Sequence, residues 1–265
     1  MEATKENPTV SVIIPTLNEE FYVSNLLDSL FGQTFKDFEV LVVDGCSEDK
    51  TAEVCEKYYK EKLPSLSVFN AGYRGVSRQR NFGAKNARAD ILLFLDADVI
   101  IPSDFLEKAL NEFAAKKGDM ATCMSLPLSD NLFDRFAFVI LNAIVKNLRL
   151  ANGWTIFSKK SLHESLNGFN EKMFYFEDGD YSSRAKKKKT KVFMITATTV
   201  YVSVRRFNYE GRLRMLKKMA RFFIFSIFKG GLAAQGKIIW ETGIFKEIKK
   251  RVRLEKWIKS NRFRS

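Results

Sequence analysis

The chain has 265 residues, 46% of them hydrophobic and 13% aromatic, and a formal net charge of +13. A chain of this size and composition can bury a full core, which excludes a disordered protein and allows one large domain, or one domain with an extension. Its cysteines, Cys46, Cys55 and Cys123, form neither a CxxC pair nor an even-numbered framework, which excludes a disulfide scaffold and gives no zinc motif.

The positive charge is concentrated toward the C-terminus. Residues 181–265 hold 24 Lys and Arg against 4 Asp and Glu, whereas residues 1–180 hold 20 against 27. A basic segment of this size predicts an anionic partner, either phospholipid head groups or nucleic acid. The N-terminal stretch 1–8 lacks the apolar run that a signal peptide needs, so we expect a cytoplasmic protein.

The N-terminal half alternates short apolar runs with amphipathic stretches. Strands are predicted at 10–15, 38–43, 66–70 and 91–95, and helices at 19–31 and 76–87. Asn18 is expected to cap the first helix, and Ser47 to cap another that follows the second strand. The alternation indicates an α/β fold with an open, mostly parallel sheet flanked by helices, in which ligands bind at the carboxyl ends of the strands.

The C-terminal half is less regular. A helix is expected at 133–150, too polar for a membrane span, with strands at 153–157 and 191–204. An amphipathic helix at 208–228 carries basic side chains beside a Phe-rich end, and residues 246–259 alternate basic with apolar residues. We therefore expect a basic, amphipathic helical extension at the end of the chain.

Two carboxylates, Asp96 and Asp98, follow directly after the apolar run 91–95. Their mutual repulsion calls for a cation, and Mg²⁺ or Mn²⁺ with a bound diphosphate would supply it. One carboxylate would then bind the metal, and the other a metal-bound water or a ribose. The alternative is a solvated Asp-Ala-Asp turn that caps a helix after Pro102.

Four stretches occur in a fixed order along the chain. They are VSVIIPTLNEE from residue 10, LVVDGCSEDKT from residue 41, GVSRQRNFGAKNARADILLFLDADV from residue 75, and GWTIFSKKSL with LNGFNEKMFYFEDGDYSSR from residues 153 and 166. Together they resemble the family 2 glycosyltransferases, which are inverting enzymes of the GT-A fold, over about residues 8–205; four linked motifs are more specific than one. The resemblance implies a GT-A type, Rossmann-like catalytic domain at 1–205, with a nucleotide-binding half at about 8–100 and an acceptor half at about 101–205, and leaves 206–265 as the extension.

The resemblance also implies a donor site at the strand ends. The residues expected to line the pocket for the base and ribose are Pro15, Thr16, Asn18, Glu19 and Asp44. A carboxylate that accepts from a base N–H suits Asp44, whose alternative role is a helix cap or turn residue. The order of the motifs makes Asp98 the direct metal ligand and Asp96 its ribose-side or water-mediated companion.

Arg80 and Asn81 match the family's Arg-Asn pair that precedes the acidic motif. They are similar to residues that reach the nucleotide, and a guanidinium fits a phosphate through its forked geometry. A surface salt bridge is the alternative for Arg80.

The acidic group at 177–180 resembles the family's Glu-Asp motif. Inverting transfer needs a base that deprotonates the acceptor hydroxyl, and we predict Asp178 in that role with Glu177 beside it. Glu177 and Asp180 would orient the acceptor or bind Arg184. The alternative is a charged helix start stabilised by the helix dipole.

Two aromatic side chains have more than one possible role. Trp154 lies on the acceptor side by resemblance, where it could stack on a sugar or pack in the core. His163 has no ligand-type neighbours in the sequence, and we expect it on the surface or in a helix rather than in catalysis.

The expected activity is inverting transfer of a sugar from a nucleotide sugar to a hydroxyl acceptor, either lipid-linked or a glycan, with Mg²⁺ or Mn²⁺. We expect the protein at the inner face of the cell membrane, where the extension would contact anionic lipid, with no nucleic-acid partner. One alternative is a nucleotidyltransferase, although residues 15–18 do not form the Gly-rich phosphate loop it would need. The other is a nucleic-acid-binding protein that uses the basic tail, which contains no recognised module.

Overall fold

The computed structural model describes residues 7–59, 62–63, 65–173, 176–212 and 214. The predicted helix at 208–228 falls mostly outside this part, and the alternating stretch 246–259 falls completely outside it. In the described ranges, no helix combines the length and apolar content that crossing a bilayer requires.

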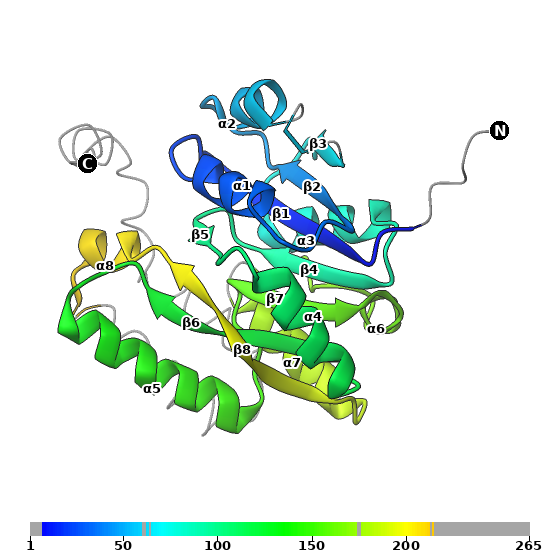
Figure 1. The fold of residues 1–265 in the computed structure, drawn as a ribbon, viewed down its shortest axis with the longest axis vertical. Helices are drawn as coiled ribbons and strands as arrows, with labels where there is room; N and C mark the ends of the chain where they lie inside the picture. Colours follow the sequence, from blue (N-terminus) through cyan, green and yellow to red (C-terminus); the bar gives the residue numbers. More distant parts are fainter. Residues whose placement is uncertain (1–6, 60–61, 64, 174–175, 213, 215–265) are drawn as a thin grey trace.

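One mixed, mostly parallel sheet of eight strands forms the centre of the molecule, in the order β3-β2-β1-β4-β7-β6-β8-β5 (Figure 1). The strands are β1 (Val10–Thr16), β2 (Phe38–Asp44), β3 (Leu66–Asn70), β4 (Ile91–Leu95), β5 (Val99–Ile100), β6 (Met120–Pro127), β7 (Thr155–Lys159) and β8 (Val192–Val202). The first four run parallel to one another, and β7 joins them antiparallel to β4. The predicted open sheet is confirmed, whereas β5 and β6 were not predicted.

Helices cover both faces of the sheet. They are α1 (Val23–Phe31), α2 (Thr51–Val54), which continues as the π-helical turn η1 (Cys55–Tyr59), α3 (Val76–Asn86), α4 (Phe105–Ala115), α5 (Leu132–Leu148), α6 (Lys160–Ser165), α7 (Glu177–Lys187) and α8 (Arg205–Glu210). The side chains of β1 alternate between the faces, as those of a strand must. Val12 packs in a core cluster with α1 and α4, and Ile13 packs in another with α3, α6 and α7.

The caps expected for the first two helices are wrong. Asn18 has a left-handed φ of 56°, and α1 begins five residues later, at Val23. The Asn18 side chain accepts instead from the Glu48 backbone N–H at 2.8 Å, and Ser47 Oγ accepts from the Asn18 N–H at 2.9 Å. Both residues therefore tie the loop after β1 to the loop after β2, since a short polar side chain can satisfy loop backbone as readily as a helix end.

Gly83 allows α3 to pack directly on the sheet. A Cβ at this position would lie 2.4 Å from Cγ2 of Ile13 and 3.3 Å from Cγ2 of Val43. We expect Gly83→Ala to destabilise the fold by about 1–3 kcal/mol, because an extra methyl in a packed core forces its neighbours apart. Urea denaturation measures this, with Gly32→Ala as the control because its added Cβ would meet no atom closer than 3.5 Å. Equal midpoints for the two variants would contradict the packing of α3 on β1.

Candidate active site

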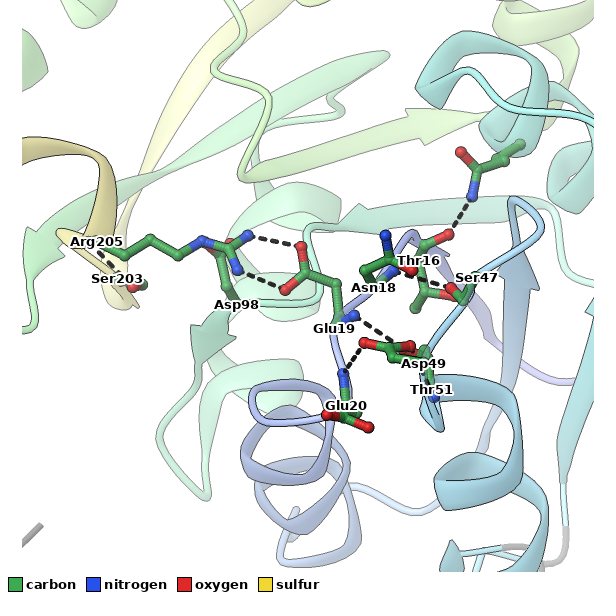
Figure 2. A network of polar contacts seen from close by, with 11 residues as sticks. Thr16, Asn18, Glu19, Glu20, Ser47, Asp49, Thr51, Asp98, Ser203 and Arg205 are labelled. Carbon is green, nitrogen blue, oxygen red and sulfur yellow. Dashed lines mark hydrogen bonds and ion pairs between the residues drawn. The ribbon is translucent and has the colours of Figure 1, made fainter. Parts of the chain in front are cut away.

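The loops after β1 and β2 meet at one edge of the sheet (Figure 2). Thr16 and Asp44 are register partners at the ends of these strands, and the Thr16 hydroxyl donates to Asp44 Oδ1 at 3.2 Å. The Ser47 backbone N–H donates to Asp44 Oδ2 at 2.9 Å, and its hydroxyl donates to Oδ1. The structure thus brings Thr16, Asn18 and Asp44 together, with the Asp44 carboxylate held in place by its neighbours.

Arg80 lies at the centre of a buried charge cluster behind this edge. Its side chain, on α3, is 1% exposed, so the alternative of a surface salt bridge is wrong. Nη1 donates to Glu177 Oε1, and Nη2 donates to both Asp96 Oδ1 and the Gly153 carbonyl, each at 2.8 Å. Burial opposes the charge of Arg80, but the neighbouring carboxylates outweigh burial and raise its pKa.

Asp178 stands beside this cluster in the first turn of α7. Burial, followed by the charge of Glu177, raises its pKa to about 7, against the opposing effects of Arg80 and the Gly179 N–H. A Cβ added at Gly153 would lie 3.3 Å from Asp178 Oδ2, so the backbone of this glycine packs close against the carboxylate. A carboxyl that is half ionised near neutral pH is suited to accept a proton in catalysis.

A second arginine, Arg205 of α8, pairs with acidic residues in the loops after β1 and β4. Its two Nη atoms donate to the Glu19 carboxylate at 2.6 Å each, and its Nε lies 3.0 Å from Asp98 Oδ2, as Figure 2 shows. The guanidinium also lies over the Tyr22 ring, 4.6 Å from its centroid. Burial raises the pKa of Glu19, and Arg205 opposes that shift.

Sequence reasoning missed Arg205. It is one of 44 Lys and Arg residues, and it lies at the last position of the predicted catalytic domain. Phe207, two residues after Arg205, is buried in the core, where it is 6% exposed. Arg212 donates two hydrogen bonds to the Asp134 carboxylate, at 2.8 and 2.9 Å. The first residues of the predicted extension therefore pack against the rest of the described chain.

Other predicted site residues make hydrogen bonds, an ion pair and a ring contact with the elements around Arg80. The Asn81 side chain donates to the Phe169 carbonyl at 2.9 Å and accepts from its N–H at 2.8 Å. Asp180 pairs with Arg184 at 2.7 Å within α7. Trp154 stacks on Phe138 at 5.3 Å, and its carbonyl accepts from the Asp96 N–H at 3.3 Å.

His163 lies in helix α6, one of its two expected positions, and it is not on the surface. The residue is 6% exposed, and its Nδ1 lies 3.0 Å from the Tyr181 hydroxyl. Burial lowers its pKa to about 4, so the ring is neutral at physiological pH. It belongs to the core between α6 and α7.

A divalent cation at this edge would take its ligands from both the protein and a substrate. Within the residues described, no group of three or more His, Cys, Asp or Glu side chains is arranged to hold a metal. Asp96 and Asp98 nevertheless offer the oxygen ligands that Mg²⁺ and Mn²⁺ prefer, and one or two carboxylates suffice when substrate phosphates and waters complete the shell. The acidic pair is thus compatible with a cation carried on a diphosphate.

The model of glycosyl transferase family 2 matches residues 11–150, more than half of the chain. The chain belongs to this family. Its membership agrees with the resemblance of its motifs.

Two curated relatives illustrate the match. Poly(ribitol-phosphate) beta-N-acetylglucosaminyltransferase TarS of Staphylococcus aureus is 40% identical over 101 residues, covering 37% of this chain and 18% of TarS. The uncharacterized glycosyltransferase EpsJ of Bacillus subtilis is 31% identical over 116 residues, covering 44% of this chain and 33% of EpsJ. The matches thus span less than half the length of either relative.

Solved structures share the fold. S. aureus TarS 1–349 in complex with UDP-GlcNAc has a TM-score of 0.59 at 26% identity, covering 74% of this chain and 59% of that one. The mannosyltransferase PcManGT from Pyrobaculum calidifontis, in complex with GDP-Man and Mn²⁺, has a TM-score of 0.65 at 22% identity, covering 79% and 61%. The GT-A type fold expected from the sequence is therefore confirmed.

Proposed function

We propose that this family 2 member transfers a sugar from a nucleotide-sugar donor to a hydroxyl acceptor with inversion at the anomeric carbon, and that Asp178 is the general base. The observation that carries the proposal is a carboxyl of raised pKa beside a buried Arg80–Asp96–Glu177 cluster, at the carboxyl end of β4. Family membership supports it, as do the nucleotide sugars named with the similar structures.

The donor would bind along the edge formed by the loops after β1, β2 and β4. The residues proposed for its base and ribose are Pro15, Thr16, Asn18, Glu19 and Asp44, with Asp96 on the ribose side. Asp98, with Asp96, would hold Mg²⁺ or Mn²⁺, which when bound neutralises charge on the diphosphate leaving group. Arg80 would not contact the donor directly but would hold Asp96 and Glu177 in place through its hydrogen bonds.

In the proposed reaction the acceptor hydroxyl gives its proton to an oxygen of Asp178 as its own oxygen attacks the anomeric carbon. The bond from that carbon to the diphosphate oxygen breaks, and the electron pair leaves with the nucleoside diphosphate. Attack from the face opposite the leaving group inverts the configuration. Asp178 must be ionised to begin.

The acceptor and location are proposed from the relatives and the charge pattern. TarS is named for poly(ribitol-phosphate), and GgaB of Bacillus subtilis for minor teichoic acid biosynthesis, which favours a polysaccharide, glycan or lipid-linked acceptor. Trp154, Asp180 and Arg184 would lie on the acceptor side. We place the protein at the cytoplasmic face of the membrane, with the basic extension 206–265 on anionic lipid.

A panel of nucleotide sugars tests the proposed function. UDP-GlcNAc, GDP-Man and related donors, each with Mn²⁺ or Mg²⁺, are scored for thermal stabilisation and for donor hydrolysis. We expect at least one donor to stabilise the wild type and Asp130→Ala, whose side chain is fully exposed, but not Asp98→Ala. If all three proteins ignore every donor, the proposal fails.

Arg205 and a divalent cation would compete for Asp98. We expect Arg205→Gln to bind Mn²⁺ in the absence of donor on the order of tenfold more tightly, because Glu19 and Asp98 lose the cation that balances them. Titration calorimetry measures this, with the exposed Arg135→Gln as the matched control. Unchanged or weaker Mn²⁺ binding by Arg205→Gln would contradict Asp98 as a metal ligand.

A further inference from the structure

Helix α5 has a second apolar face that no described residue covers. Four large exposed side chains follow the spacing of one helix face, and their exposed fractions are 80% for Leu132, 64% for Phe136, 62% for Val139 and 45% for Ile140. The helix runs along the margin of the molecule (Figure 1). A contiguous exposed apolar surface of this kind marks an interaction site.

The inner face of α5 already accounts for its packing in the fold. Ala137, Phe138 and Val145 are buried there, and Asn142 hydrogen-bonds the backbone of Ser125. A surface helix of a globular protein needs one apolar stripe, with polar residues opposite. The outer stripe of α5 is therefore not required by the core, and its partner must come from elsewhere.

The charges beside the outer stripe are basic except for Asp130, which precedes the helix and pairs with Arg135 at 3.0 Å. Arg135, Lys146 and Arg149 are exposed along α5, and Lys186 Nζ donates to the Leu148 carbonyl at 2.9 Å, which brings the run 186–189 to the end of the helix. The single acidic residue of α5, Asp134, is fully buried and held by Arg212. An apolar stripe flanked by Lys and Arg suits an anionic bilayer surface, which offers acyl chains and phosphates side by side.

We propose that α5 lies in the plane of an anionic lipid surface, with its outer stripe among the acyl chains and its basic side chains at the phosphates. Charge argues against two other occupants. A second copy would set basic residues against basic residues, and the chain's own segment 213–265 carries 15 Lys and Arg against 3 Asp and Glu. The inference deepens the proposed membrane location and does not depend on sugar transfer.

The placement has a consequence for the acceptor. The inner face of α5 contacts the candidate active site, since Phe138 stacks on Trp154, and the adjacent Gly153 lies against Asp178. One helix diameter, about 10–12 Å, would therefore separate the lipid from these residues. An acceptor carried on a lipid phosphate at this surface would have its hydroxyl close to the proposed base.

Vesicle flotation of the full chain tests the proposal. We expect the wild type to float with vesicles of equal phosphatidylglycerol and phosphatidylcholine but not with phosphatidylcholine alone. Replacing Leu132, Phe136 and Val139 with Ser should weaken binding to the anionic vesicles by at least about tenfold. The control, Phe31→Ser, removes an aromatic side chain that is 47% exposed on α1 and should bind as the wild type does. Equal binding by the triple variant and the wild type would overturn the proposal.

A fluorophore at position 136 gives a second readout that does not depend on affinity. We attach an environment-sensitive label to Phe136→Cys or Phe31→Cys, each in a Cys46→Ser background because Cys46 is partly exposed. Anionic vesicles should shift the emission of the label at 136 to the blue and leave the label at 31 unchanged. A label at 136 that is already shielded without lipid would mean that protein covers α5, and would overturn the proposal. Donor-induced thermal stabilisation of the same variants reports separately on the proposed function.

Discussion

Replacing Asp178 with Asn is expected to lower kcat for sugar transfer by on the order of 10²–10⁴-fold, because an amide cannot take the acceptor proton. The substitution keeps the size of the side chain beside Gly153 and Arg80, so donor affinity should change little. Initial rates and donor binding by calorimetry separate the two effects. The matched control is Asp130→Asn, which makes the same change at a fully exposed carboxylate outside the candidate site. Equal activity of Asp178→Asn and the wild type would exclude Asp178 as the base.

The pH dependence gives an independent reading of the same residue. Since the base must be ionised, wild-type kcat/KM should rise as the pH increases through about 7, the raised pKa of Asp178. A carboxyl whose pKa is higher in the folded than in the unfolded state favours folding at low pH, and this contribution is lost as the pH rises through the folded pKa. Asp178→Asn should therefore gain stability relative to the wild type between pH 4 and pH 8, and urea midpoints at both pH values measure the gain.

Arg80→Ala is expected to destabilise the fold by about 3–5 kcal/mol, because removing one partner of a buried ion pair leaves its carboxylates without a cation. Arg80 serves Asp96, Glu177 and the Gly153 carbonyl at once. Lys should not rescue it, since a single ammonium cannot reproduce a planar fork that bonds in several directions. Denaturant melts of both variants measure the cost.

The control for this prediction is Arg74→Ala. Arg74 pairs with Glu48 at the surface, where the side chains are 49% and 74% exposed, so its loss should cost no more than about 1 kcal/mol. A wild-type melting profile for Arg80→Ala would mean that Arg80 does not hold the site together. Activity alone would not decide this, because an unfolded variant is also inactive.

The sequence predicted the N-terminal half of the fold because β1, β2 and β4 are buried on both faces and read as nearly continuous apolar runs. Val10–Thr16 and Ile91–Leu95 are of this kind. β6, with Thr122, Cys123 and Ser125 among its residues, has no such run and was missed. Its polar side chains are satisfied by tertiary contacts, as when Thr122 Oγ1 donates to the Thr155 carbonyl at 2.8 Å, and no local pattern reveals such contacts.

The order of the motifs was enough to predict the acidic residues of the candidate site. It did not predict which arginine pairs with each of them. Each carboxylate of the Asp96-Ala97-Asp98 run has an arginine partner, Arg80 for Asp96 and Arg205 for Asp98. Arg80 lies 16 residues from Asp96 in the same stretch that begins at residue 75, and the resemblance was enough to name it. Arg205 comes from the far end of the described chain, and only the fold brings it to Glu19 and Asp98. The sequence also did not predict that α5 carries apolar side chains on two faces, because that requires knowing which face packs in the core.

The anomeric configuration of the first product tests the central claim most directly. Proton NMR can follow the donor that stabilises the protein, with water as the acceptor if none other is known, and can identify the sugar released before mutarotation. With Asp178 as base in a single displacement, the account predicts a product of opposite anomeric configuration to the donor, formed by the wild type and not by Asp178→Asn. A product that retains the configuration of the donor would contradict it.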